Sequence, residues 1–203
     1  MSQMRSERGF STIEMAVTAI VLLIIAGISI FVLGNSLPAM RTNTGLVTTM
    51  EVLRQARQTA IDQRRTIIVT FNAPSGAVHT ITVQRVAAGV IDPNFIQQFP
   101  LPSDVQFVAD AKLPKPPNTP DGFGNGTAAI DFEDAVAIKP GNQVYFLPDG
   151  SAQSPAGNLE NGVVYIERPG YFQFCRAVTV FGGTGKIRSW RLQQVSAGVW
   201  KWQ

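Results

Sequence analysis

The chain has 203 residues, 45% of them hydrophobic and 15% charged, which suits one domain with a real core behind about 30 N-terminal residues of different character. Its formal net charge of +3 is too small by itself to indicate a nucleic-acid partner. Cys175 is the single cysteine among the 203 residues, so no intrachain disulfide can form among them. The apolar neighbours of Cys175 predict a buried, unreactive thiol.

The chain begins with a short polar segment that contains Arg5 and Arg8, followed by an apolar run from Met15 to Leu33. As a helix this run would be roughly 28 Å long, close to the hydrocarbon thickness of a bilayer. The run therefore predicts a membrane-spanning helix. The arginines before it predict that its start faces the cytoplasm.

Glu14 stands at the mouth of the apolar run, where a carboxylate is costly. A secretory signal peptide, with a weak cleavage site at 34–36, and a plain signal anchor both explain the run, but neither explains Glu14. Two environments are open for the carboxylate. It pairs with a buried cation, or it extends to the lipid headgroups without a partner.

Residues 8–14 read Arg-Gly-Phe-Ser-Thr-Ile-Glu, and with the aliphatic run behind them they resemble the class III leader of type IV prepilins and type II secretion pseudopilins. The resemblance implies that a prepilin peptidase cuts after Gly9 and methylates the new N-terminus at Phe10. It also implies that Glu14 pairs with the amine of a processed Phe10 on a neighbouring subunit and so sets the register of assembly.

A second helix is predicted beyond the apolar run. Gly34 and Pro38 predict a kink or a short unwound turn between 34 and 38. Apolar residues at 46, 50, 53, 56 and 60 then recur at three- and four-residue steps, which predicts an amphipathic helix ending near Arg65. The basic residues on it favour a solvated face over an anion site; they are Arg54, Arg57, Arg64 and Arg65.

The rest of the chain is rich in short β-branched and aromatic runs separated by glycine and proline turns. Strands are expected over 66–71, 78–83, 101–108, 142–147, 163–166, 172–181 and 187–195, and an exposed loop over 115–122. A helix followed by strands predicts an α+β fold, with a long N-terminal helix packed on an antiparallel sheet.

Several single residues bear on possible chemistry. His79 is the only histidine and is predicted at an exposed strand position, which leaves no histidine-based metal cluster. An acidic cluster at 131, 133 and 134 favours surface solvation over calcium binding, since it lacks the spacing of a calcium loop. The segment Gly182–Lys186 is glycine-rich, but Val180 and Ile187 break the phosphate-loop pattern on both sides, so a hairpin turn is predicted.

Three later segments, 53–60, 146–151 and 184–191, are similar to the GspH/FimT family of minor pseudopilins and minor pilins, whereas 85–140 matches nothing. The resemblance implies a pilin-like fold and a filament subunit at or near the tip, not an enzyme, with no cofactor. It divides the chain into a leader peptide (1–9), a transmembrane and assembly helix (10–38), an amphipathic second half of the helix (39–66) and a periplasmic β-rich domain (67–203) with a Pro/Gly-rich loop at 109–127.

Two functions follow from the resemblance. The first is a minor pseudopilin of the type II secretion pseudopilus that supports protein secretion across the outer membrane. Its partners are other pseudopilins, the prepilin peptidase and an inner-membrane assembly platform. It is a single-pass protein of the bacterial inner membrane with a periplasmic domain. The alternative is a minor type IV pilin of the FimT type, which takes part in pilus assembly and DNA uptake.

The C-terminal region carries the argument for DNA. No acidic residue follows Glu167, and Lys186, Arg188 and Trp190 alternate onto one face of an expected strand, with Arg191 beside them. Cations for phosphates and aromatic rings for bases are what a single strand requires. An ordinary solvated surface, with Trp190 in the core, is the other interpretation.

Overall fold

The computed structural model describes residues 11–87, 89–132, 141–154 and 157–203, and only the backbone of 30–35. It divides into two compact units, Met1–Leu37 and Pro38–Gln203. The helix α1 (Thr12–Gln63) begins in the first unit and ends in the second. Within the first unit, Thr12–Ser29 has a mean hydropathy of 2.2 and buries none of its residues against the chain. This helix is long and apolar enough to cross a membrane.

The predicted unwound turn between Gly34 and Pro38 is absent. Pro38 lies inside α1, although it has no N–H to donate to the carbonyl of Gly34. The helix continues, and the hydroxyl of Thr42 donates a hydrogen bond to the Pro38 carbonyl at 2.9 Å. The free energy lost with this one hydrogen bond is therefore smaller than the free energy that the helical residues on both sides of Pro38 contribute.

The second unit contains two five-stranded antiparallel sheets. The first has the order β3-β2-β1-β5-β6, and the second has the order β10-β9-β8-β7-β4. The strands of the first sheet are β1 (Ile67–Asn72), β2 (Thr80–Ala87), β3 (Val90–Pro100), β5 (Gln143–Phe146) and β6 (Ala152–Gln153). Those of the second are β4 (Ile130–Phe132), β7 (Gly162–Ile166), β8 (Arg176–Phe181), β9 (Lys186–Ser196) and β10 (Val199–Trp202). The short 3-10 helices are η1 (Pro120–Gly122) and η2 (Phe172–Phe174).

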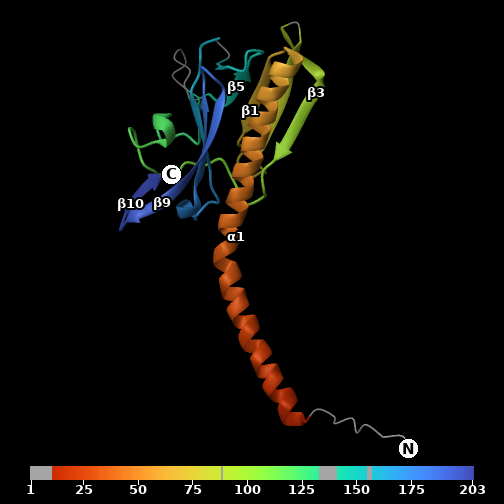
Figure 1. Ribbon diagram of the computed structural model, residues 1–203, viewed down its shortest axis with the longest axis vertical. Coiled ribbons are helices and arrows are strands. Elements are labelled where there is room, and N and C mark those ends of the chain that lie inside the picture. The colour runs from red at the N-terminus through yellow and green to blue at the C-terminus, as the bar shows by residue number, and fades with distance from the viewer. Residues whose placement is uncertain (1–10, 88, 133–140, 155–156) are drawn as a thin grey trace, which may run out of the picture. The chain divides into compact units, whose positions relative to one another are not determined.

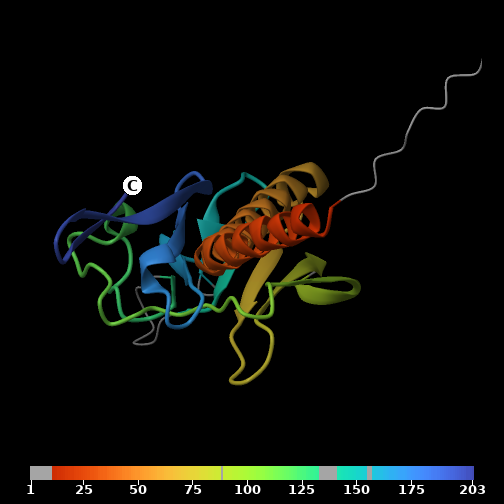
Figure 2. The same ribbon diagram turned by 90° about the horizontal axis from the view of Figure 1, so that it is seen from below.

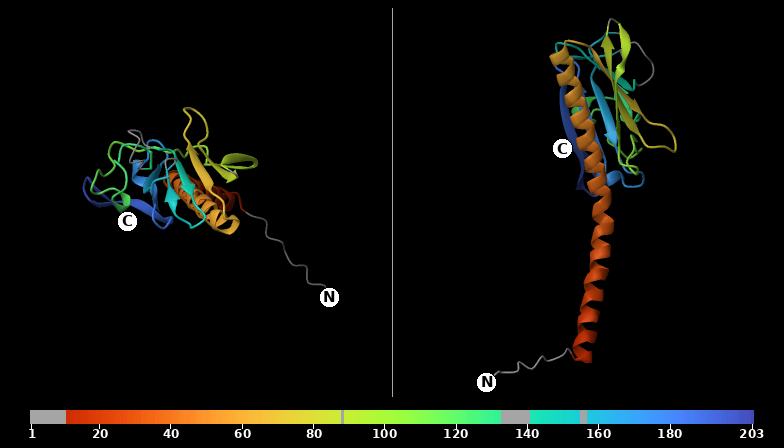
Figure 3. Two further views of the ribbon diagram at one scale, coloured as in Figure 1. Left: turned by 90° about the horizontal axis from the view of Figure 1, so that it is seen from above. Right: turned by 90° about the vertical axis from the view of Figure 1, so that its right-hand side faces the viewer.

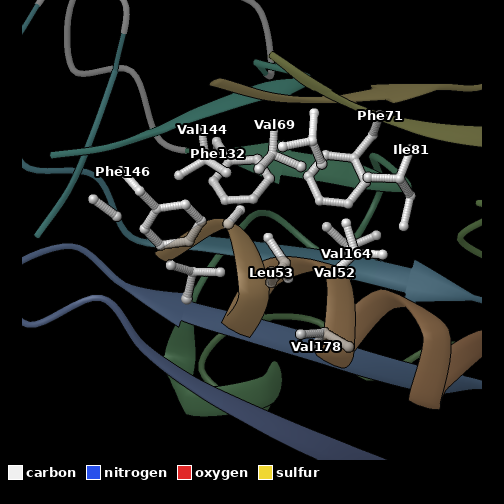
Figure 4. Close-up of a cluster of buried hydrophobic side chains, with 14 of the residues drawn as sticks. Val52, Leu53, Val69, Phe71, Ile81, Phe132, Val144, Phe146, Val164 and Val178 are labelled. Carbon is white, nitrogen blue, oxygen red and sulfur yellow. The ribbon is translucent and has the colours of Figure 1, made fainter. Parts of the chain in front are cut away.

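The expected α+β architecture is confirmed. Within the second unit, β3 lies at one side and the β9–β10 hairpin at the opposite side (Figures 1, 2 and 3). The second half of α1 contributes its apolar stripe to a core shared with both sheets. Val52 and Leu53 point from the helix toward Phe71, Phe132 and Phe146 (Figure 4). The rings of Phe71 and Phe132 stack with centroids 5.6 Å apart.

One strand prediction is wrong, and four of the observed strands were not predicted: β3, β4, β6 and β10. Residues 101–108 form no strand, but the side chains of Leu101, Val105 and Phe107 are buried in the core. β3 contains Pro93, which is tolerated because β3 lies at the edge of its sheet. The short strand β10 was not predicted.

The prediction for His79 is also wrong, because its side chain is buried. Its Nδ1 accepts a hydrogen bond from the N–H of Phe107 at 2.9 Å, and its ring lies 5.6 Å from the Phe107 ring. Burial lowers the pKa of His79. The prediction for Cys175 is confirmed, since its side chain is fully buried and burial raises the pKa of the thiol well above its usual value.

Candidate functional site

The assembly residues lie at the start of the chain. Gly9 and Phe10 are outside the described residues. Glu14 lies in the first turn of α1 and is exposed. The carbonyl of Ser11 accepts hydrogen bonds from the N–H groups of Glu14 and Met15, at 3.0 and 3.1 Å, which starts the helix there. The carboxylate therefore stands at the N-terminal end of the membrane-length segment, where the helix dipole favours a negative charge.

The hairpin between β8 and β9 is formed by Gly182–Gly185. Gly185 has a φ of 60°, and its N–H donates a hydrogen bond to the carbonyl of Phe181 at 2.7 Å. A Cβ at Gly185 would lie 2.1 Å from the Gly150 carbonyl oxygen and 2.8 Å from Nε of Arg57. Only glycine fits there, so the predicted hairpin turn is confirmed and lies tightly against a second turn and the helix.

Lys186, Arg188 and Trp190 alternate along β9, as predicted, and are opposite Phe181, Thr179 and Ala177 of β8. Since side chains alternate along a strand, Arg191 belongs to the other face. Lys186, Arg188 and Arg191 are exposed, whereas Trp190 is half-buried. The structure thus brings three of the four predicted residues to one face and separates the fourth.

Arg188 has a partner that the sequence pattern did not reveal. Its Nη1 forms an ion pair with Oδ1 of Asp121, 2.8 Å away, in the 3-10 helix η1. The other oxygen of Asp121 accepts a hydrogen bond from the hydroxyl of Thr179 at 2.6 Å, and Nε1 of Trp190 donates to that hydroxyl at 3.1 Å. The charge of Arg188 is therefore offset, and Trp190 is held by a structural network.

Trp190 packs against the second core cluster of the domain, together with Trp200 and Trp202 of β10. The Trp202 ring lies 5.6 Å from that of Tyr165, and the Trp200 ring meets Phe172 edge-on at 4.9 Å. These tryptophans are only partly exposed, so they serve the core on one side and reach the surface on the other.

Two arginines face each other across β8 and β9. Arg176 is directly opposite Arg191 in the antiparallel register. Burial lowers the pKa of Arg176, and the nearby charge of Arg191 acts in the same direction. Nη1 of Arg176 donates to the carbonyls of Phe174 and Cys175, both at 3.0 Å, which fixes that guanidinium beside η2.

Three of the hollows in the described part of the chain are lined by residues of β9 or of its partner strands and turns. A groove of about 580 Å³ is lined by Arg54, Arg57, Gln58, Thr184, Gly185, Lys186 and Ile187. A hollow of about 310 Å³ is lined by Asp121, Phe123, Phe181, Thr184, Lys186 and Arg188. A third, of about 260 Å³, is lined by Asn118, Thr119, Asp121, Gly122, Trp190, Lys201 and Trp202. The first two share Thr184 and Lys186 and therefore adjoin at the β8–β9 turn.

The acidic cluster lies only partly within the described residues. Asp131 is buried, and its Oδ2 accepts a hydrogen bond from the N–H of Asn125 at 2.8 Å. Residues 133 and 134 are outside the described residues. Among the residues that are described, no three acidic, histidine or cysteine side chains are grouped so as to hold a metal ion. Asp131 serves the loop that precedes β4.

No protein-family model and no curated protein matches the sequence. Among solved structures, the chain is similar to the type IV minor pilin FimU of Pseudomonas aeruginosa, with 15% identity and a TM-score of 0.44 over 72% of this chain and 85% of that one. It is also similar to EpsH, a minor pseudopilin of the Type 2 Secretion System of Vibrio cholerae, with 13% identity and a TM-score of 0.45 over 74% and 97%. These values describe a similarity of backbone fold, so the role of this protein is argued from its own residues.

Proposed function

We propose that this chain is a minor pseudopilin, a structural subunit of the type II secretion pseudopilus that acts at its initiation or tip and supports protein secretion. The observation that carries the proposal is the segment of residues 8–29. A leader-like motif ends in Glu14, and the helix behind it exposes every residue from Thr12 to Ser29. The proposal gives this helix two successive environments, the bilayer before assembly and neighbouring subunits after it.

The role of Glu14 follows from charge burial. A carboxylate moved from water into hydrocarbon requires a cation close by or loses its charge. In the proposal, the peptidase removes residues 1–9 and methylates Phe10, whose amine on a neighbouring subunit becomes that cation. The β-rich domain then lies in the periplasm, and the assembly platform of the inner membrane takes up the processed subunit. The role has no catalytic step.

The test combines processing with assembly. Intact mass and N-terminal analysis of the protein extracted from membranes should give a chain that starts at a methylated Phe10. Glu14→Gln keeps the shape of the side chain and removes its charge, so membrane insertion should be unchanged while incorporation into filaments falls. Glu51→Gln, an exposed glutamate in the second half of α1, is the matched control. An uncleaved Met1, or an N-terminus near Leu37, refutes the proposal.

The alternative, a minor type IV pilin that binds DNA, is favoured by the surface of β9 and β10. Lys186, Arg191 and Lys201 are exposed, and the third hollow places Lys201 beside the half-exposed rings of Trp190 and Trp202. Cations and aromatic rings at one surface suit a single strand. Arg188 contributes less than expected, because Asp121 offsets its charge.

Retardation of a single-stranded oligonucleotide by the detergent-solubilised full chain tests this alternative. Binding should weaken steeply with salt and should fall in Lys201→Gln, because each phosphate contact releases counterions. Arg65→Gln removes the same charge from an exposed position just beyond the end of α1 and serves as the control. Absence of binding at low ionic strength rules out the DNA role and leaves the filament role intact.

A further inference from the structure

The groove of about 580 Å³ that contains Arg54 (the basic groove) and the adjoining hollow of about 310 Å³ that contains Phe181 (the aromatic hollow) differ in chemistry. The groove carries the cationic side chains of Arg54, Arg57 and Lys186, and none of its seven lining residues is acidic. Gln58 at its border donates a hydrogen bond to Asp62 at 2.8 Å. This groove is therefore a concave site with three positive charges, where anions are favoured.

The groove is held in shape by its own contacts. Nε of Arg57 donates to the carbonyl of Gly150 at 3.0 Å, which ties α1 to the turn between β5 and β6. Because residue 185 is a glycine, the β8–β9 turn can lie directly against the Gly150 carbonyl and the guanidinium of Arg57. Arg57 is thus fixed by a structural bond. The side chains of Arg54 and Lys186 are exposed and make no hydrogen bond or ion pair with any described residue, so both are available to a ligand.

The neighbouring hollow has two aromatic walls, and its charged lining residues, Asp121, Lys186 and Arg188, carry a formal net charge of +1. The rings of Phe123 and Phe181 lie 5.9 Å apart at an angle of 40°, and 47% of Phe181 is exposed. Arg188 and Asp121 line another side of the hollow, and their opposite charges offset each other in an ion pair. A large apolar side chain fits this environment, with Lys186 and Thr184 between it and the basic groove.

We propose that the two hollows together bind an acidic protein segment, with carboxylates in the groove at Arg54, Arg57 and Lys186 and an aromatic or large aliphatic side chain packed against the rings of Phe123 and Phe181. The site keeps most of its unpaired positive charge apart from its rings. The lining of the groove contains no aromatic residue, and in the aromatic hollow Asp121 pairs with Arg188, which leaves Lys186, shared with the groove, as the unpaired cation of that lining. A nucleic-acid strand needs cations and rings interleaved along its track. A short peptide with acidic residues beside one aromatic residue matches the observed separation. The proposal is independent of the filament role.

The experiment measures fluorescence anisotropy of a rhodamine-labelled peptide, glycine-glutamate-aspartate-phenylalanine-glutamate-glycine, with the full chain in detergent. Two further peptides carry amides in place of the carboxylates or glycine in place of the phenylalanine, and an oligothymidine carries the same label. The acidic aromatic peptide should bind in a salt-sensitive manner, and each altered peptide should bind at least about tenfold more weakly.

The variants test the residues. The double variant Arg54→Gln with Lys186→Gln should weaken binding of the acidic peptide about tenfold or more, and Arg65→Gln, outside the groove, should leave it unchanged. Phe181→Ala should weaken binding of the phenylalanine peptide but not binding of the glycine peptide. This result is expected if the side chain of Phe181 contacts the phenylalanine of the peptide, because the two changes are then not additive. The proposal is overturned if the acidic peptide does not bind, if its amide form binds equally, if the double variant binds as the parent does, or if oligothymidine binds more tightly with the same dependence on Arg54.

Discussion

Glu167 offers a sharp test of the structure, because it is a carboxyl group almost fully removed from water. It directly follows β7 and is 1% exposed. Its backbone exchanges two hydrogen bonds with Gln106, at 2.8 and 2.9 Å, and within the described chain its Oε2 has no hydrogen-bond partner. Burial raises the pKa of Glu167 to about 7, and the negative charge of Asp110 acts in the same direction, against a weaker opposing hydrogen bond with Cys175.

The consequence is a loss of stability as the pH rises. In the unfolded chain Glu167 ionises around its ordinary pKa of 4.5, whereas in the folded chain it stays protonated up to about 7. The unfolded state therefore binds fewer protons between these values, and the free energy of unfolding falls across that window. At 1.36 kcal/mol per pKa unit, the fall amounts to about 3 kcal/mol at most. It is complete above pH 7 and absent below 4.5.

Glu167→Gln keeps the shape and removes the titration. Urea unfolding of the full chain in detergent at pH 5 and pH 8, followed by the fluorescence of the three tryptophans, measures the effect. The variant should gain stability relative to the parent at pH 8 and show little gain at pH 5. His79 acts with the opposite sign, since its lowered pKa means that stability is lost as the pH falls below 6.5, but it contributes equally to both proteins. An equal difference at both pH values refutes the reasoning, and Glu51→Gln controls for surface charge.

Two further predictions concern the core. Leu53→Ala removes a fully buried side chain that faces both sheets, so it should lower the free energy of unfolding by about 2–5 kcal/mol in urea titrations, while Val47→Ala, 43% exposed on the same helix, should cost less than about 0.5 kcal/mol. A small effect of Leu53→Ala would mean that the helix does not pack as described. Cys175 should react with a maleimide only as fast as the domain unfolds, because burial both blocks the thiol and raises its pKa. Complete labelling of the folded protein within minutes at neutral pH would contradict its burial.

The sequence predicted elements whose signals are local. The stripe that includes Leu53 and Ala56 has helical spacing, and both residues are buried as that spacing requires. The turn at Pro148–Ser151 is one of the glycine and proline turns expected between the strands, and it is also local. The N–H of Gly150 donates to the carbonyl of Leu147 at 2.9 Å, and Asp149 accepts hydrogen bonds from Ser151. Such features depend on residues within a few positions of each other.

The failures involve partners far apart in the chain. The alternation around His79 favoured an exposed position, but its ring is buried by Phe107, 28 residues later. The sequence placed Arg188 on a cationic face that suits either DNA or solvent, but it did not reveal the ion pair with Asp121, which lies 67 residues earlier. No local pattern encodes either pair. The basic groove is a similar case, because Arg54 and Lys186 meet only when the β8–β9 turn closes against the helix.

The outermost strand of the first sheet has a consequence for solubility. β3 is long, and Val90, Ile91 and Ile96 are exposed on it, which would invite pairing with another molecule. Pro93 offers no N–H along that edge, and the register with β2 shifts between Gln84 and Val86. A proline and a shift in one strand interrupt the row of groups that a foreign strand would join. These two features disfavour edge-to-edge pairing of β3 with a strand of another molecule.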